Sequence, residues 1–154
     1  MFSAFPHEQR VLGDDPRIGK GRGKPLPDIY CLALETINAD LRARGETEIK
    51  PEECLVFEDA VPGVEAGRRA GMRVVWCPHP GLWAAFSNRE AEVLAGLTKE
   101  HKDEEKAGAE KEAQYLESWR VQGAGNPGQV GDGWAERLQS LEDFSYEKYG
   151  IEVP

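Results

Sequence analysis

The sequence predicts an α/β fold with a parallel sheet, and three observations support this prediction. The stretch CLVFE, residues 54–58, is a short, almost continuous apolar run, which is typical of a strand covered on both faces of a parallel sheet. A Pro-Gly pair and a helical segment follow it, and MRVVWCP, residues 72–78, is a second apolar run. A strand, a helix and a strand with short connections form a right-handed βαβ unit.

The N-terminal part of the chain predicts a loop followed by one helix. Residues 11–12 indicate a brief strand at most, which runs into a glycine-rich, basic loop, GDDPRIGKGRG. Asp28 is the expected N-cap of the helix, because its carboxylate can accept hydrogen bonds from exposed backbone N–H groups. Apolar residues then recur at helical spacing and Gly45 is suited to a C-terminal cap, so we expect a helix over about 28–44.

The middle of the chain contains the clearest boundaries between elements. Pro62 suits the first turn of a helix, where its missing N–H group is not needed. Gly71 suits the left-handed conformation that commonly ends a helix. These two residues predict a helix over about 62–70, between the two apolar runs.

The C-terminal half predicts three further segments, which set the expected organisation of the chain. Residues 82–97 contain a helical pattern, and we assign residues 1–98 to the α/β core. Residues 99–133 combine a mixed-charge tract with a glycine-rich stretch and predict a flexible insert. Residues 134–154 regain aromatic side chains and predict a C-terminal element that packs on the core.

Composition excludes several classes of partner. The chain of 154 residues is long enough for one domain with a core, and its net charge of −9 argues against a broad surface for nucleic acid or for an anionic membrane. No apolar run approaches the length of a membrane span, and we expect no secretory signal. The cysteines Cys31, Cys54 and Cys77 have apolar neighbours and no metal-binding spacing. We therefore expect a reducing compartment, the cytoplasm.

Two adjacent acids at the end of the first apolar run are the first candidate site. Glu58 and Asp59 follow the expected strand directly. In open α/β sheets ligands bind beyond the carboxyl ends of the strands, and carboxylate oxygens are ligands that Mg²⁺ prefers. The alternative is that the pair caps the following helix. The residues alone leave these two interpretations about equally supported.

A lysine in a glycine-rich loop is the second candidate. In GRGKPLPD, Gly23 lets the backbone approach a ligand, and Lys24 carries a point charge suited to phosphate. The alternative is an ordinary surface lysine before a proline-rich turn, and for an isolated lysine that alternative is favoured.

The two candidates together resemble one enzyme superfamily. GDDPRIGKGRGKPLPDIYCLAL, followed after about thirty residues by CLVFEDAVPGVEAGRRAGMRVVWCP, is similar to the haloacid dehalogenase superfamily of phosphatases. Within it, the chain resembles the β-phosphoglucomutase-like and pseudouridine-5′-phosphatase-like group. The similarity covers about residues 2–80, and SLEDFSYEKYG near the C-terminus resembles that group's C-terminal end.

The resemblance implies a role for each candidate residue. Lys24 would stabilise the phosphoryl group and the nucleophile to which it is attached. Asp59, with Glu58, would hold Mg²⁺. The implied activity is Mg²⁺-dependent hydrolysis of a small phosphorylated metabolite (a sugar, nucleoside or polyol phosphate) through an aspartyl-phosphate. The implied fold is a three-layer Rossmann-like core.

The sequence also departs from the family pattern. The family's nucleophile belongs to a D-x-D motif, and this chain contains no D-x-D. The resemblance therefore implies an incomplete core that lacks the nucleophile strand and the cap domain, is inactive alone, and is complemented by a missing N-terminal half. A degenerate, non-catalytic binding or regulatory module is a second hypothesis. A small acidic α/β domain with structural carboxylates is the third.

Overall fold

A computed structural model describes residues 6–98 and 128–153. Its longer elements, in chain order, are α1 (Asp28–Ala43), β1 (Leu55–Glu58), α2 (Val61–Arg69), β2 (Arg73–Trp76), α3 (Pro80–Phe86), α4 (Glu90–Ala95) and β3 (Ala135–Arg137). Short 3-10 turns lie at His7–Gln9, Pro51–Glu53, Ser87–Arg89, Leu141–Asp143 and Glu147–Tyr149.

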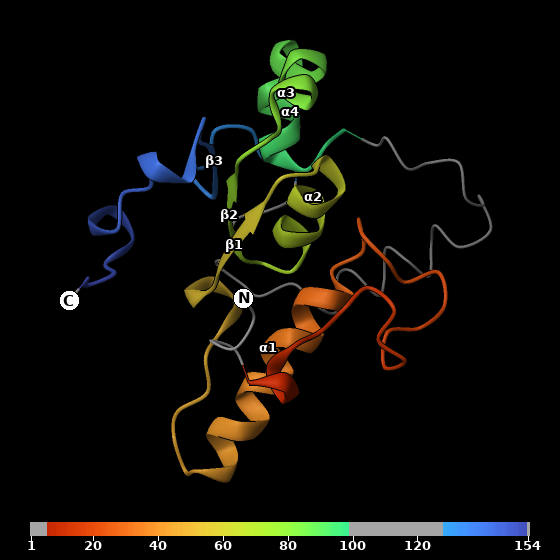
Figure 1. The fold of residues 1–154 in the computed structure, drawn as a ribbon, viewed down its shortest axis with the longest axis vertical. Coiled ribbons are helices and arrows are strands. Elements are labelled where there is room, and N and C mark those ends of the chain that lie inside the picture. The colour runs from red at the N-terminus through yellow and green to blue at the C-terminus, as the bar shows by residue number, and fades with distance from the viewer. Residues whose placement is uncertain (1–5, 99–127, 154) are drawn as a thin grey trace.

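The described strands form one parallel sheet in the order β1-β2-β3, as Figure 1 shows. Leu55 pairs with Arg73 and Glu58 with Trp76, so β1 and β2 end at the same edge. The predicted βαβ unit over residues 54–78 and the α/β class with a parallel sheet are thus confirmed. The third strand comes from the C-terminal segment and lies beside β2.

The largest buried cluster lies on one face of this sheet. Successive residues of a strand point to opposite faces, and Val56, Val74 and Trp76 face the helices. They form a buried cluster with side chains from α2, α4 and the turn between α2 and β2, namely Val61, Val64, Ala70, Met72 and Val93. Burying a valine side chain fully contributes about 1.5–3 kcal/mol. On the other face, Phe57 is 48% exposed and its ring contacts that of Phe144.

Glycine caps end two of the helices as the sequence predicts. Gly71 has a φ of 73° and donates to the carbonyl of Arg68 at 3.1 Å, while Met72 donates to that of Gly67 at 3.1 Å. This pair of hydrogen bonds is a Schellman motif, which satisfies carbonyl groups at the end of α2. Gly45, with a φ of 72°, closes α1 in the same way.

Three expectations about local structure are corrected. Residues 11–12 form no strand, and the chain turns there, with the N–H of Asp15 bonded to the carbonyl of Leu12 at 3.0 Å. Asp28 is the first residue of α1 and Pro27 is the N-cap. The Asp28 carboxylate binds the guanidinium of Arg22 at 2.8 and 2.9 Å. The helix expected over 82–97 is divided into α3 and α4 by a 3-10 turn.

A buried ion pair joins the C-terminal segment to α2. The Arg68 side chain is fully buried, and its Nη1 donates to Oδ1 of Asp132 at 2.9 Å. Asp132 also accepts the N–H of Trp134 at 3.0 Å, and the carbonyl of Trp134 accepts the N–H of Val74 at 2.9 Å. The guanidinium of Arg73 lies 4.5 Å from the Trp134 ring centre. These contacts fix the start of β3 against β2.

One expectation about the organisation of the chain stays a prediction. The flexible insert predicted at 99–133 falls largely on residues 99–127, which lie outside the described residues. Within the described ranges, no helix has the length and apolar character needed to cross a membrane. The three cysteines are free thiols.

We expect Asp132→Asn to destabilise the fold by about 3 kcal/mol at neutral pH, because the buried guanidinium loses the negative charge that faces it. Urea denaturation measures this change. Asp143→Asn is the control, because Asp143 is exposed and its change is expected to stay within about 0.5 kcal/mol. An equal effect of the two substitutions would contradict a structural role for the ion pair.

The same pair makes a prediction about pH. Burial alone raises the pKa of Asp132, but the Arg68 guanidinium and the Trp134 N–H group together hold it below its ordinary value. A carboxyl whose folded pKa is lowered stabilises the fold above the unfolded pKa, about 3.9, and loses that contribution as the pH falls through the folded pKa. The stability difference between wild type and Asp132→Asn should therefore shrink below about pH 4. A difference that stays constant at acid pH would contradict this.

Candidate functional site

The candidate site lies at the carboxyl ends of β1 and β2. Because these strands are parallel and in register at Glu58 and Trp76, the residues that follow each strand meet at one edge. The N–H of Cys77 donates to the carbonyl of Glu58 at 2.8 Å, and the indole Nε1 of Trp76 donates to the carbonyl of Asp59 at 3.2 Å. Strand β2 thus holds the backbone of the acidic pair.

The glutamate of this pair is bound by two donors from the N-terminal part of the chain. The ammonium of Lys24 and the hydroxyl of Tyr30 both donate to Oε1 of Glu58. The Glu58 side chain is 7% exposed and that of Lys24 is 35% exposed. The Lys24 Nζ also lies 5.2 Å from the centre of the Tyr30 ring. The structure therefore brings together the lysine and the acid that the sequence singled out separately.

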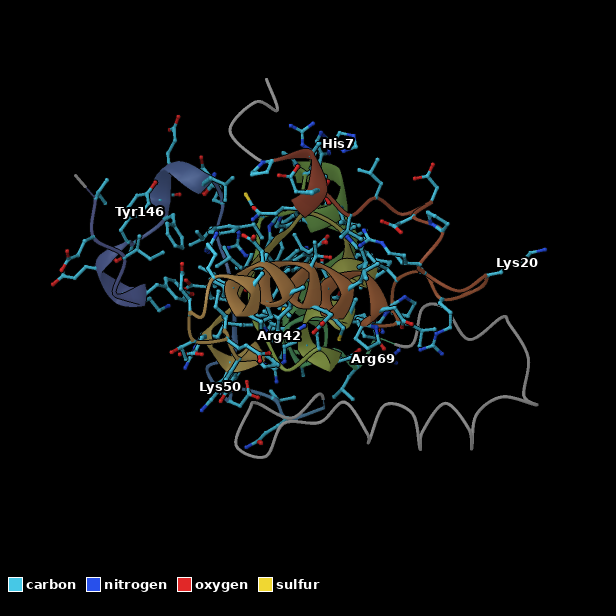
Figure 2. All side chains as sticks on the ribbon, turned by 90° about the horizontal axis from the view of Figure 1, so that it is seen from below. His7, Lys20, Arg42, Lys50, Arg69 and Tyr146 are labelled. Atoms are coloured by element: carbon cyan, nitrogen blue, oxygen red, sulfur yellow. The ribbon has the colours of Figure 1, made fainter. Side chains whose placement is uncertain are left out.

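The loop that carries Lys24 makes a side-chain contact with a helix on each side of the lysine. Before the lysine, Arg22 binds Asp28 at the start of α1. After it, the carbonyl of Pro25 accepts a hydrogen bond from Nη1 of Arg69 at 3.2 Å, and the Lys24–Pro25 peptide is cis. By contrast, Lys20 extends from the same loop away from the core (Figure 2).

A glycine in α2 makes room for the glutamate. A Cβ atom built on Gly63 would lie 1.9 Å from Oε2 of Glu58, so the carboxylate lies against the bare backbone in the first turn of α2. The positive end of a helix dipole favours a negative charge in that position. The N-cap of α2 is Ala60, and no side chain caps it. The interpretation of Glu58 and Asp59 as capping residues is therefore not supported.

Asp59 differs from its neighbour in its surroundings. It is exposed to solvent, while Glu58 is almost fully covered. Carboxylate oxygens suit Mg²⁺, which needs only one or two protein acids when phosphate and water complete its shell. Within the described ranges no three His, Cys, Asp or Glu residues are grouped to hold a metal. The site thus offers one open acidic ligand.

The tyrosine keeps its proton in this environment. Burial raises the pKa of Tyr30 well above its ordinary value, and its hydrogen bond to Glu58 and the negative charges of Glu58 and Asp59 raise it further. The hydroxyl is therefore a hydrogen-bond donor at neutral pH.

Sequence reasoning missed Tyr30 and Gly63. Tyr30 lies in the first turn of α1, six positions beyond Lys24, and that proximity was a signal that its side chain reaches the same place. Gly63 follows Pro62 in a helix start, where glycine is otherwise unfavourable. Gly23, in contrast, is exposed and a side chain there would meet open space, so its part in phosphate binding stays a prediction.

Comparison with known proteins identifies similar hydrolases. Residues 5–71 match the model of the haloacid dehalogenase-like hydrolases. This chain is 51% identical over 86 residues to a probable pseudouridine-5′-phosphatase of Saccharomyces cerevisiae, covering 56% of this chain and 34% of the relative. It is 37% identical over 97 residues to a probable pseudouridine-5′-phosphatase of Drosophila melanogaster, covering 63% and 37%.

A third relative is named as a phosphatase of a different compound. A mitochondrial (DL)-glycerol-3-phosphatase of Arabidopsis thaliana is 37% identical over 97 residues, covering 63% of this chain and 29% of the relative. Over residues 5–71 the chain is therefore similar to the haloacid dehalogenase-like hydrolases, the family that its two motifs resemble. It spans about a third of the length of the curated relatives that it matches. No solved structure matches it significantly.

We expect Gly63→Ala to disturb the site more than the fold. The new methyl group displaces the end of the Glu58 side chain, while alanine gains about 1 kcal/mol of helix propensity. The unfolding free energy should change by less than about 1 kcal/mol. The NMR signals of the Tyr30 ring and the Lys24 side chain should shift, which a lysine- and tyrosine-labelled sample measures.

Gly67→Ala is the matched control in the same helix. Its Cβ would lie 2.8 Å from Val74 Cγ2 and 3.3 Å from Val56 Cγ1, in the core and not in the site. Overpacking there should cost about 1–3 kcal/mol. If Gly63→Ala left the Tyr30 and Lys24 signals unchanged, the described position of the Glu58 carboxylate would be wrong.

Proposed function

We propose that this chain contributes part of the site of a Mg²⁺-dependent phosphatase that acts on a small phosphorylated metabolite. One observation carries the proposal: the Lys24 ammonium meets the Glu58–Asp59 pair at the carboxyl edge of a parallel sheet. Ligands of open α/β sheets bind at that edge. A cation beside open acidic oxygen is suited to phosphoryl transfer, in which catalysis consists mainly of positioning and neutralising charge.

In the proposed reaction an aspartate carboxylate attacks phosphorus, and the bond between phosphorus and the ester oxygen breaks. The leaving oxygen takes the bonding electrons and a proton from the second aspartate of the D-x-D motif. That aspartate then accepts a proton from the water that hydrolyses the aspartyl-phosphate to inorganic phosphate and the free aspartate. Lys24 neutralises the negative charge of the phosphoryl oxygens. Gly23, next to it in the exposed loop, leaves the backbone free to approach the phosphate.

The residues at the edge fit a magnesium ion. Asp59 supplies an exposed carboxylate, and phosphate oxygens and water complete the shell that Mg²⁺ prefers. Bound there, the ion would neutralise charge on the phosphoryl group. Glu58 is the second acid of the pair and is the one that binds Lys24.

The substrate is proposed as a phosphate monoester of a small metabolite. The relatives include proteins named pseudouridine-5′-phosphatase, (DL)-glycerol-3-phosphatase and phosphorylated carbohydrates phosphatase. Sugar, nucleoside and polyol phosphates are accordingly the three classes to test. We place the reaction in the cytoplasm, because three free cysteines suit a reducing compartment.

The nucleophile is proposed to come from a segment that bears a D-x-D motif, which the 154 residues do not contain. Strand β1 bonds to β2 on one side, and within the described ranges no strand pairs with its other edge. Phe57 of β1 is 48% exposed. A strand added to this edge would end beside Glu58 and Asp59 and would cover unpaired backbone groups.

A second candidate function follows from the same observation. Without a D-x-D motif, the lysine and the acids can bind a phosphorylated compound and Mg²⁺ but cannot form the covalent intermediate. Under this alternative the chain is a binding or regulatory module with the same fold. Hydrolysis by the completed site decides between the two.

The test uses a chimera in which the region of the Saccharomyces cerevisiae relative that precedes its match is joined to this chain. We expect this chimera to hydrolyse para-nitrophenyl phosphate in the presence of Mg²⁺. The chain as printed should show no turnover, because it has no D-x-D aspartate. In the chimera, Lys24→Met should lower kcat by at least about 100-fold, as loss of a charge-stabilising group does.

Lys20→Met is the matched control, because Lys20 belongs to the same loop but points away from the core. It should leave the rate unchanged. A chimera that is folded but inactive supports the binding module and contradicts catalysis. Turnover by the chain as printed that disappears in Asp59→Asn would show that the nucleophile lies within these residues.

A further inference from the structure

We propose that a recess at the carboxyl edge of the sheet, where α3 meets the end of β3, binds a small organic carboxylate through Arg137. The recess has a volume of about 210 Å³ and is lined by Pro78, Pro80, Trp83, Arg137 and Gln139. The inference goes beyond the proposed function and does not depend on it, because none of these residues is assigned to the site around Lys24.

The recess is separate from the site around Glu58, although both lie at the same edge. Glu58 is in register with Trp76, and Trp76 is in register with Arg137, so one whole strand lies between the two sites. Neighbouring strands are about 4.8 Å apart, which places the backbones of Glu58 and Arg137 about 10 Å apart along the edge. A ligand in the recess therefore meets a different set of side chains.

The first observation concerns the guanidinium group of Arg137. Its Nε donates to Oε1 of Glu90 at 3.3 Å, and the group lies 4.0 Å from the centre of the Trp83 ring. Among the described residues, no hydrogen bond engages its terminal Nη1 and Nη2 atoms. The side chain is 26% exposed. The paired donors at the end of a guanidinium group match the two oxygens of a carboxylate.

The second observation is that the walls beside these donors are flat and apolar. They are the rings of Pro78 and Pro80 and the indole of Trp83. An apolar cavity of about 150 Å³ admits a benzene ring, so a recess of about 210 Å³ has room for one ring and its carboxylate. The recess thus fits an anionic group joined to a flat apolar body.

The third observation is that the walls are held in place by the fold itself. The Trp83 ring packs edge-on against the fully buried Trp76 ring, with the ring centres 6.1 Å apart. The N–H of Trp83 donates to the carbonyl of His79 at 3.0 Å, and the N–H of Leu138 donates to that of Trp76 at 2.9 Å. Because the recess is preformed, less conformational entropy is lost when a ligand binds.

The surroundings favour a carboxylate over a phosphate. Phosphate has more oxygens to satisfy and a higher charge, whereas the side-chain donors that line the recess belong to Arg137 and Gln139. Further phosphate oxygens would face apolar walls, and burying a charged group without partners is costly. Glu90 beside Arg137 and the net charge of −9 also oppose a dianion more than a monoanion.

The test is an NMR titration of the whole chain with benzoate, benzamide and inorganic phosphate. Benzoate should shift the signals of the Trp83 indole and of the Arg137 Nε–H group. Benzamide has nearly the same shape without the charge and should bind at least about tenfold more weakly. Equal binding of benzoate and benzamide, or no response to benzoate, would overturn the proposal. Tighter binding of phosphate at these signals would overturn the choice of a carboxylate.

Substitutions assign the contact to Arg137. Arg137→Met removes the paired donors and should weaken benzoate binding at least about tenfold, as the loss of a charge-assisted hydrogen bond does. Arg73→Met is the matched control, because the Arg73 guanidinium also lies over an indole, that of Trp134 at 4.5 Å, but at the opposite end of β2. It should change the affinity by less than about twofold, since the two sites are independent. Equal losses would overturn the assignment.

A second variant keeps the test decisive if Arg137→Met does not fold. Arg137→Lys keeps a positive charge near Trp83 but lacks the paired donors, and it should lower the benzoate affinity at least about threefold. An unchanged affinity in Arg137→Lys would contradict the paired contact. Hydrolysis by the chimera bears on the proposed function alone, so the failure of one proposal leaves the other standing.

Discussion

The carboxylate of Glu58 is the contact on which the site depends. It joins the end of a strand to a lysine 34 residues earlier and to a tyrosine 28 residues earlier, and it lies against the backbone of a helix that follows it. Each partner comes from a different element, so loop, α1, β1 and α2 are all positioned relative to one charge. An almost buried carboxylate must be satisfied in this way, because burying a charge without partners is costly.

Much of the fold could be predicted because its boundaries are encoded by local chemistry. Gly45 and Gly71 mark helix ends through the left-handed conformation that each adopts, and Pro62 marks a helix start. Strand β3 could not be predicted: it has three residues, and its docking depends on Arg68 and Asp132, which are 64 residues apart. Pairing at such separation leaves no periodic pattern in the sequence.

The candidate site was predicted in its residue types but not in its geometry. The motifs identified Lys24, Glu58 and Asp59, and parallel strands require the acids to lie at one edge. The patterns could not show that the lysine binds the glutamate, because that contact depends on how α1 packs beside the sheet. Tyr30 lies near Lys24 in the sequence, which was a signal for its position, but its hydrogen bond to Glu58 and the contact of Gly63 with the same carboxylate follow only from the tertiary structure.

The central claim is that the two motifs form one site through the pair of Lys24 and Glu58. A double-mutant cycle on the free energy of unfolding tests it most directly, with Lys24→Met, Glu58→Gln and the combined variant. The account predicts a coupling energy of at least about 0.5 kcal/mol at low salt, the range found for residues in direct contact. Effects that add within about 0.3 kcal/mol would mean that the two side chains do not interact, and would contradict the account.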